Sequence, residues 1–400
     1  MSPVSNGAPP APRFVPFAYG FRPFFLAAGW YALIAVVVWG SLHSLGISPF
    51  GSLPPYLWHG HEMLFGFVTA AIAGFMLTAV PSWTGGRGFA GWPLVVLTIV
   101  WLAGRLAVGS AGWIPLPVLA VAELAFLPAL AVTLAPSLLR TANRNRPLML
   151  VLLVLWATDV TFVYALRNGD AVLAGTALRT ALNIVLLLIT VIGGRIVPSF
   201  TSNALRRRGI EADVRVRRGI ERSVIGGMIA LVAADLIAPR HWVTTSIVAA
   251  VAAVHAWRML GWQGFRTTRE PIVWVLHAAY AWLPIGLALK AVHLLTGAAW
   301  AAHWMHALSV GAAATMILAV MTRAALGHTG RPLIVGRSIA VSYALIVAAA
   351  TVRVFGPALL PFAYHWTVGI ASLLWIAAFL IFAVMYTPIL IGPRADGKPG

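Results

Sequence analysis

Apolar runs of about 20 residues recur along the chain from Phe24 to Ile391, and they constrain its fold more than any other feature. A helix of this length crosses a hydrocarbon core of roughly 30 Å at about 1.5 Å per residue. Segment 149–155 is continuously apolar and segment 185–191 is so except for Thr190, whereas strands of a membrane β-barrel alternate over about ten residues. The sequence therefore predicts an all-α polytopic transmembrane bundle.

The composition agrees with a membrane protein, because 60% of the residues are hydrophobic and only 10% are charged. We predict a single transmembrane domain over 24–391, between an N-terminal segment, 1–23, and a tail, 392–400. The twelve expected spans are 24–43, 59–80, 92–109, 116–138, 148–166, 171–193, 223–238, 242–258, 272–295, 303–323, 338–354 and 361–391.

The net charge of +18 would suggest nucleic acid for a soluble protein, but here the basic residues lie in the loops between the predicted spans. Most fall on the side that both termini share, including Arg140, Arg144, Arg146, the run from Arg206 to Arg222, Arg258, Arg266, Arg269, Arg331 and Arg337. Only Arg167, Arg240 and Arg353 fall on the other side. The positive-inside rule then places both termini in the cytoplasm, with the basic face against anionic lipids. Residues 1–22 are rich in proline and do not resemble a cleavable signal peptide.

The basic segment 201–222 is the longest polar stretch, and we expect it to be a cytoplasmic loop that separates six spans from six. Prolines are expected to mark span ends, where a missing N–H costs little. These are Pro54, Pro55, Pro81, Pro115, Pro117, Pro198 and Pro271.

The chain has no cysteine. This excludes disulfides, iron–sulfur clusters, thiolate-ligated haem and blue-copper centres. Histidine, methionine, tyrosine and carboxylates are left as metal ligands.

Two histidine groups are predicted on the outer side of the membrane. The second span enters with Trp58-His59-Gly60-His61-Glu62-Met63, and the tenth with His303-Trp304-Met305-His306. Ionisable groups in spans are costly, so they call for partners or a function. A lone interfacial histidine is more often a hydrogen-bonded neighbour of lipid headgroups, which is our interpretation of His43, His241, His255 and His365.

Helix geometry limits which histidines of each group are able to bind the same metal ion. Residues three apart share a face, so His303 and His306 are able to hold one metal, whereas residues two apart point about 200° away from each other. In a regular helix His59 and His61 therefore serve different sites, although Gly60 and the preceding prolines also allow a bent entry with both turned inward. Glu62, three residues after His59, is expected to orient that ring.

A second polar layer is predicted towards the cytoplasm, with His277 and His328 as ligands and with Arg195 and Arg323 placed to hold haem propionates or another anion. Glu123, Arg105, Asp159 and Arg179 are further charges within spans. Asp159 and Arg179 are expected at a similar depth, where they would form an ion pair. Glu62 and Asp159 are the candidate proton relay, with Glu123 as a further member.

Several motifs together resemble those of the NnrS family, over most of the chain. The matching stretches are Phe21-Arg22-Pro23-Phe24-Phe25, Trp58-His59-Gly60-His61-Glu62-Met63-Leu64-Phe65-Gly66-Phe67, Gly194-Arg195-Ile196-Val197-Pro198-Ser199-Phe200-Thr201-Ser202-Asn203, Leu276-His277-Ala278-Ala279-Tyr280, the long block from His306-Ala307-Leu308 to Met321-Thr322-Arg323, and Leu326-Gly327-His328-Thr329-Gly330-Arg331-Pro332. The resemblance implies a bacterial inner-membrane protein that binds haem b and copper and serves nitrosative-stress resistance or denitrification. His59, His61, His277, His306 and His328 match the family's histidine positions, and His303 does not.

The leading hypothesis is a haem held by neutral imidazoles, with copper nearby, that binds nitric oxide as its small-molecule ligand. Whether the protein also reduces nitric oxide, and which electron donor would serve it, are left open by the sequence. A rival from another class is a secondary transporter or metal exporter, for which twelve spans are equally suitable. A non-catalytic haem sensor or nitric oxide buffer is the third possibility. No nucleic-acid partner is expected.

Overall fold

The chain folds into helices joined by short connections. A computed structural model describes residues 14–51, 53–140, 145–211 and 213–398, and no strand occurs in these ranges. Some predicted features lie outside these ranges: Arg144, residues 1–13 of the predicted N-terminal segment and residues 399–400 of the tail. The elements are α1 (Phe21–Leu45), α2 (Pro55–His61), η1 (Glu62–Val68), α3 (Thr69–Thr84), α4 (Trp92–Gly109), α5 (Leu116–Leu124), α6 (Phe126–Arg140), α7 (Pro147–Arg167), α8 (Ala171–Arg207), α9 (Arg218–Ile237), α10 (Trp242–Leu260), η2 (Gly264–Thr267), α11 (Pro271–Thr296), η3 (Ala299–Ala301), α12 (Trp304–His306), η4 (Ala307–Ala314), α13 (Thr315–His328), α14 (Arg337–Leu359), η5 (Pro361–Ala363) and α15 (Tyr364–Ile391).

Within these ranges, eleven helical stretches are long and apolar enough to cross a membrane. This confirms an all-α polytopic membrane bundle. The remaining predicted span, 223–238, corresponds to α9, which has 20 residues but also carries Glu221, Arg222 and Asp235. Its length corresponds to about 30 Å, enough for one crossing.

The two described ends of the chain lie together. The Val15 amide donates to the Ile391 carbonyl at 2.7 Å, and the buried Arg22 guanidinium donates to the Leu390 carbonyl at 2.9 Å. Two ends on one face require an even number of crossings, so α9 has to be counted with the eleven apolar stretches. The assignment of this face to the cytoplasm remains a prediction from charge.

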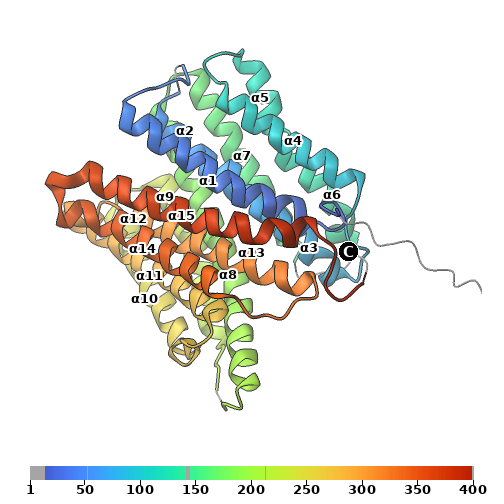
Figure 1. Cartoon of the computed structure of the whole chain (residues 1–400). Helices are drawn as coiled ribbons and strands as arrows, with labels where there is room; N and C mark the ends of the chain where they lie inside the picture. Colours follow the sequence, from blue (N-terminus) through green and yellow to red (C-terminus); the bar gives the residue numbers. More distant parts are fainter. Residues whose placement is uncertain (1–13, 52, 141–144, 212, 399–400) are drawn as a thin grey trace, which may run out of the picture.

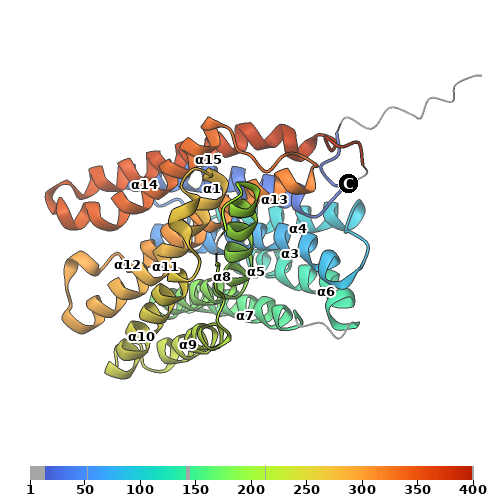
Figure 2. The same ribbon diagram turned by 90° about the horizontal axis from the view of Figure 1, so that it is seen from below.

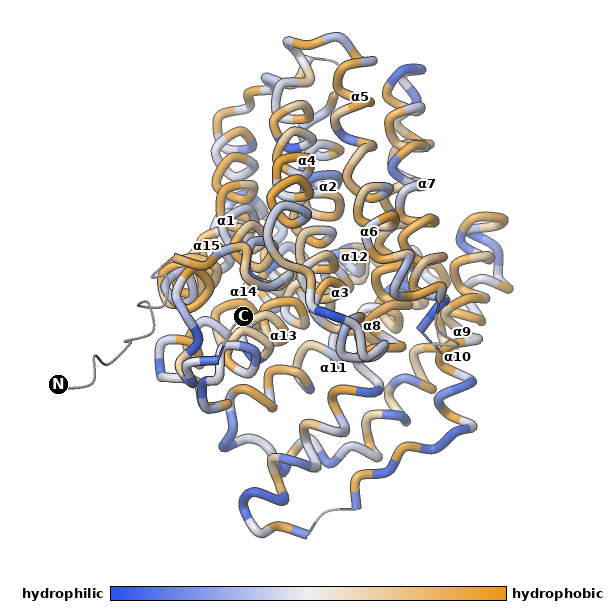
Figure 3. The backbone as a smooth tube through the Cα atoms, turned by 90° about the vertical axis from the view of Figure 1, so that its right-hand side faces the viewer, coloured by the Kyte–Doolittle hydropathy of each residue, from blue (hydrophilic) through white to orange (hydrophobic). Residues whose placement is uncertain are grey.

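The bundle has a buried centre and an apolar periphery. In the 18-residue apolar window of each stretch, buried residues make up 83% within Pro55–Thr84 and 78% within Ala171–Arg207, but 39% within Phe21–Leu45 and within Arg337–Leu359. Helices α14 and α15 lie along one edge and α9 and α10 along the opposite one, and α1 runs beside α15 (Figures 1 and 2). Hydrophobic colour covers most of the helices, with the hydrophilic stretches strongest in the connections (Figure 3). The exposed apolar faces suit lipid contact.

Two predicted boundaries are wrong, because two prolines lie inside helices. Pro81 is in α3, and Pro198 is in α8, which continues to Arg207. The predicted loop 201–222 is therefore shorter and lies between α8 and α9, which begins at Arg218. Proline is tolerated within membrane helices where neighbouring groups satisfy the freed backbone.

Two π-helices interrupt the central spans. The segment η1 follows His61, and η4 follows His306. Such i→i+5 turns are rare and change which side chains share a helix face. Both occur directly after a predicted metal-binding histidine.

Candidate functional site

The first site is a group of ionisable side chains inside the bundle, which we call the carboxylate cluster: His61, Glu62, Arg105, Glu123 and Asp159. They come from α2, η1, α4, α5 and α7, and each is at most 6% exposed. Asp159 lies eight residues before the end of α7 at Arg167, about 12 Å along the helix axis. The cluster is therefore well within the predicted hydrocarbon region.

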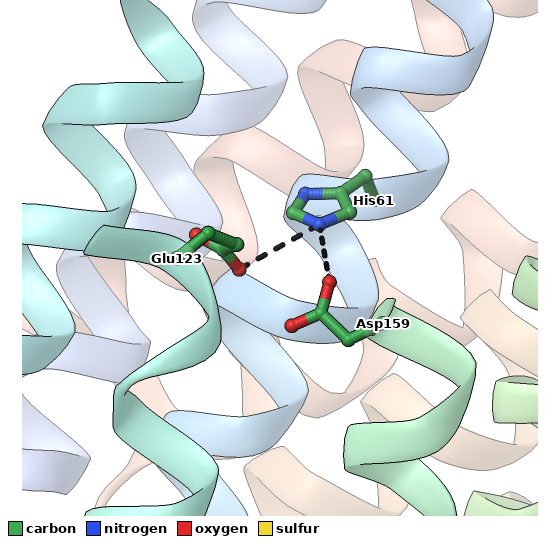
Figure 4. Close-up of side chains that lie close together, drawn as sticks. All are labelled: His61, Glu123 and Asp159. Atoms are coloured by element: carbon green, nitrogen blue, oxygen red, sulfur yellow. Dashed lines mark hydrogen bonds and ion pairs between the residues drawn. The ribbon is translucent and has the colours of Figure 1, made fainter. Parts of the chain in front are cut away.

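His61 is at the centre of this cluster. Its Nδ1 is 2.8 Å from Glu62 Oε1, and its Nε2 is 3.1 Å from Asp159 Oδ1. The same Nε2 is 3.6 Å from Glu123 Oε1 (Figure 4). One ring thus meets three carboxylates from three different helical segments.

Arg105 links two of these carboxylates. It donates to Glu62 Oε1 at 2.7 Å and forms an ion pair with Glu123. The Tyr31 hydroxyl hydrogen-bonds the other oxygen of Glu62. Three carboxylates and one guanidinium sum to −3 + 1 = −2, so a neutral His61 leaves two negative charges without compensation. Burying such charge costs several kcal/mol unless it is paired.

Small residues let these groups approach. A methyl group on Gly66 would lie 2.3 Å from the Tyr31 ring, and one on Gly104 would lie 2.7 Å from Glu123 Oε2. The Trp101 indole donates to the Gly66 carbonyl at 3.1 Å, a bond that reaches the backbone of the π-helix. Phe162 stacks on the His61 ring with centroids 4.5 Å apart. The cluster is tightly enclosed by apolar packing.

The second site, which we call the histidine cluster, lies at the end of the bundle opposite the chain ends. It consists of His43 at the end of α1, His59 on α2, His303 and His306 at α12, and His365 on α15. The centroids of His43 and His365 are 5.6 Å apart, and those of His303 and His306 are 6.4 Å apart. His59 is close enough to His306 for electrostatic interaction.

Trp39 and Arg353 organise the histidine cluster. Trp39 stacks on both His43 and His59, with centroids 5.4 and 4.7 Å apart. Arg353 donates to His303 Nδ1 at 3.2 Å. Among the described residues Arg353 forms no ion pair with a carboxylate. The cluster therefore combines imidazole rings with one cation.

The His59-Gly60-His61 motif is divided between the two sites. Helix α2 is regular through His61, so the ring of His59 points to the histidine cluster and that of His61 to the carboxylates. The bent entry is not observed. Glu62 contacts His61 rather than the expected His59.

The predicted ion pair between Asp159 and Arg179 is also absent. Asp159 contacts His61, and Arg179 donates to Thr176 Oγ1 at 2.7 Å. Lys290 instead pairs with Asp235 on α9, and Asn183 donates to the same carboxylate at 2.8 Å. These contacts explain how α9 keeps an acidic residue inside the bundle.

The residues of the predicted inner layer have separate neighbours. His277 Nε2 is 2.7 Å from Thr201 Oγ1, and His328 stacks on Tyr19 with centroids 6.0 Å apart. Arg195 donates to Asn145 at 2.8 Å. The Arg323 guanidinium lies 3.6 Å from the centroid of the Phe200 ring, and its Nη1 is buried without a hydrogen-bond partner in the described chain. Iron binding through His277 Nε2 would require the bond to Thr201 to be replaced.

Sequence reasoning did not assign Tyr31, Trp39 or Arg353 to a site. Of these three, only Arg353 stands out in the sequence as a candidate functional residue. It is one of few basic residues on its side of the predicted topology, and it lies within a predicted span. His43 and His365 were interpreted as separate headgroup neighbours, but they belong to one cluster.

A helical bundle that buries a histidine among carboxylates and gathers further histidines at one end is a polytopic membrane protein built around ionisable side chains. A family model described as NnrS protein matches residues 15–394, so the chain belongs to the NnrS family. No curated protein matches the chain.

Proposed function

We propose that this protein binds haem b and copper in the bacterial inner membrane and binds nitric oxide there, serving nitrosative-stress resistance or denitrification. Family membership supports the membrane setting of this proposal. The observation that carries it is the convergence of five histidines from separate segments on one end of the bundle.

The donor set fits metal binding. His59 Nδ1 and His43 Nε2 are buried and have no hydrogen-bond partner within the described residues. The His306 ring makes no hydrogen bond there either, and it contacts the ring of His303. Imidazole nitrogens suit both iron and copper. His59 and His306 would hold the metals, and Arg353 would neutralise an anionic group such as a propionate. His303 accepts from Arg353 at Nδ1 and so carries its proton on Nε2, and it would join them as a ligand only after releasing that bond.

Bound haem would supply an iron atom that takes up nitric oxide reversibly. Nitric oxide is small, uncharged and soluble in lipid, so it reaches a site in the bundle from the membrane itself. Trp39 fixes the His59 ring by stacking, with an interplanar angle of 18°. Arg353 fixes His303 through Nδ1. These contacts hold the rings in place before a ligand arrives.

Reduction of nitric oxide is a second candidate function. It is favoured by the carboxylate cluster, whose His61 and Glu62 closely follow His59 of the histidine cluster in the sequence. Reduction consumes protons, and Glu62 and Asp159 are buried carboxylates joined through His61. It also requires an electron donor. Anaerobic consumption of nitric oxide by purified protein with a chemical reductant separates an enzyme from a buffer or sensor.

Optical spectroscopy of the purified protein tests the binding proposal. We expect a Soret band that shifts when nitric oxide is added to the reduced protein. His59→Ala and His306→Ala should lose most of this band, whereas His241→Ala, at an exposed helix cap, should keep it. A protein without a Soret band, or an unchanged band in both cluster variants, would refute the assignment. Substrate flux in haem-free proteoliposomes would favour the transporter instead.

A further inference from the structure

We propose that His61, Glu123 and Asp159 bind one divalent metal ion, at a site separate from the histidine cluster. This inference does not depend on haem or nitric oxide binding. It starts from three ligand atoms, one on each residue, that all lie within 4.8 Å of one another. The three residues come from α2, α5 and α7, and their side chains converge on one point (Figure 4).

The spacing of these atoms matches that of metal ligands. Nitrogen and oxygen ligands lie about 2.0–2.2 Å from a first-row divalent ion. Two such ligands are then about 3.0 Å apart at octahedral angles and about 3.4 Å apart at tetrahedral angles. His61 Nε2 is 3.1 Å from Asp159 Oδ1 and 3.6 Å from Glu123 Oε1. The Glu123 and Asp159 oxygens lie within 4.8 Å of each other, so an ion beside His61 Nε2 would draw these two carboxylates closer together.

The charge of the carboxylate cluster also leaves room for a cation. With His61 neutral, Glu62, Glu123 and Asp159 exceed Arg105 by two negative charges, and no other cation contacts the cluster in the described chain. A divalent ion makes the sum −3 + 1 + 2 = 0. Two extra protons would give the same sum, so the two explanations have to be separated by experiment.

The hydrogen bonds of His61 are compatible with a metal ion at Nε2. A neutral imidazole carries a proton on one nitrogen only. When Nδ1 donates to Glu62 at 2.8 Å, Nε2 has a lone pair that faces two carboxylates and repels them. A metal ion between Nε2 and those oxygens removes the repulsion. A carboxylate on the far nitrogen of a metal-bound histidine is a common arrangement that fixes the ring and raises its basicity.

The donor set indicates the class of ion. One imidazole and two carboxylates suit borderline to hard divalent ions such as manganese, iron(II), cobalt or zinc. The soft ligands that select copper(I), cysteine and methionine, do not contribute to the ligand triad. The carboxylate cluster and the histidine cluster would therefore take different metals.

Metal analysis of the full-length protein tests this inference. We would grow cells with added Co²⁺, purify the protein in detergent without chelator, and measure metal content together with the visible absorption of Co²⁺. The expected result is about one equivalent of a first-row divalent ion that persists in His306→Ala. Asp159→Asn and Glu123→Gln should each lose it, whereas Glu62→Gln should weaken binding about 10- to 100-fold.

Asp235→Asn is the matched control, because it removes a carboxylate of the bundle that pairs with Lys290 outside the cluster. It should keep the ion. Gel filtration establishes that every variant compared is folded. The inference is overturned if the wild type carries no such ion, if Asp159→Asn and Glu123→Gln retain it, or if His306→Ala loses it. The first two results assign protons to the cluster, and the third places the ion among the histidines.

Discussion

His59 and His61 are two residues apart, yet their surroundings are chemically opposite. His61 is fully buried among three carboxylates and an arginine. His59 has an aromatic neighbour, further histidines and one arginine nearby, and its Nδ1 has no partner in the described chain. The first surroundings attract a cation through charge, whereas the second offer neutral nitrogen donors. A short motif thus contributes to two sites because successive helix positions face different parts of the bundle.

The largest difference between the two clusters should appear when their arginines are removed. Arg105→Ala leaves Glu62 and Glu123 buried without their shared cation, and breaking such a buried pair costs about 3–5 kcal/mol. Thermal unfolding in detergent measures the loss. Arg167→Ala, at an exposed position, is the control. A small change in Arg105→Ala would show that the carboxylates are already neutral.

Tyr31→Phe tests the next contact of the carboxylate cluster. The substitution removes a hydroxyl that bonds to Glu62 and keeps the ring beside Trp101. Hydrogen bonds to charged groups contribute about 1.5–3 kcal/mol, and we expect a loss in this range from thermal unfolding. Tyr56→Phe, at an exposed tyrosine, should have no effect. Equal stability of Tyr31→Phe and the wild type would argue against an ionised Glu62.

Gly66→Ala tests how closely the carboxylate cluster is packed. The added methyl group would lie 2.3 Å from the Tyr31 ring and 3.2 Å from an Arg105 nitrogen. Overpacking of this kind costs about 1–3 kcal/mol. Gly226→Ala in α9 meets no atom within 4 Å and should be neutral or stabilising, since alanine favours a helix. The prediction is wrong if both substitutions have the same effect on unfolding.

The smallest effect is expected in the histidine cluster. Arg353→Gln removes a hydrogen bond from a charged guanidinium to the ring of His303. Such bonds are worth about 1.5–3 kcal/mol, and we expect the lower end because this one is long, at 3.2 Å. The loss should be smaller than that of Arg105→Ala in the same unfolding assay. If the two losses were equal, Arg353 would be compensating a buried negative charge, and the contrast between the clusters would disappear.

The sequence predicted the helical spans well because hydrophobic length is a local property. It also predicted that His59 and His61 diverge in a regular helix. The partners of Asp159 and Glu62 were wrong, because they depend on how α2, α5 and α7 pack and on the π-helix that begins at Glu62. The sequence does not predict that α8 continues to Arg207, because Pro198 indicates a span end that the helix does not have. Neither packing nor π-turns leave a periodic signal in a uniformly apolar span.

The pairing of α1 with α15 has a consequence for biosynthesis. The first helix leaves the ribosome long before the last, yet Arg22 depends on the end of α15 for its hydrogen bonds, and His43 meets His365 only across these two helices. The histidine cluster is therefore incomplete until the whole chain has been inserted. A cofactor that uses this complete site has to arrive after translation, and a chain truncated before α15 lacks His365 and the bonds that close the bundle.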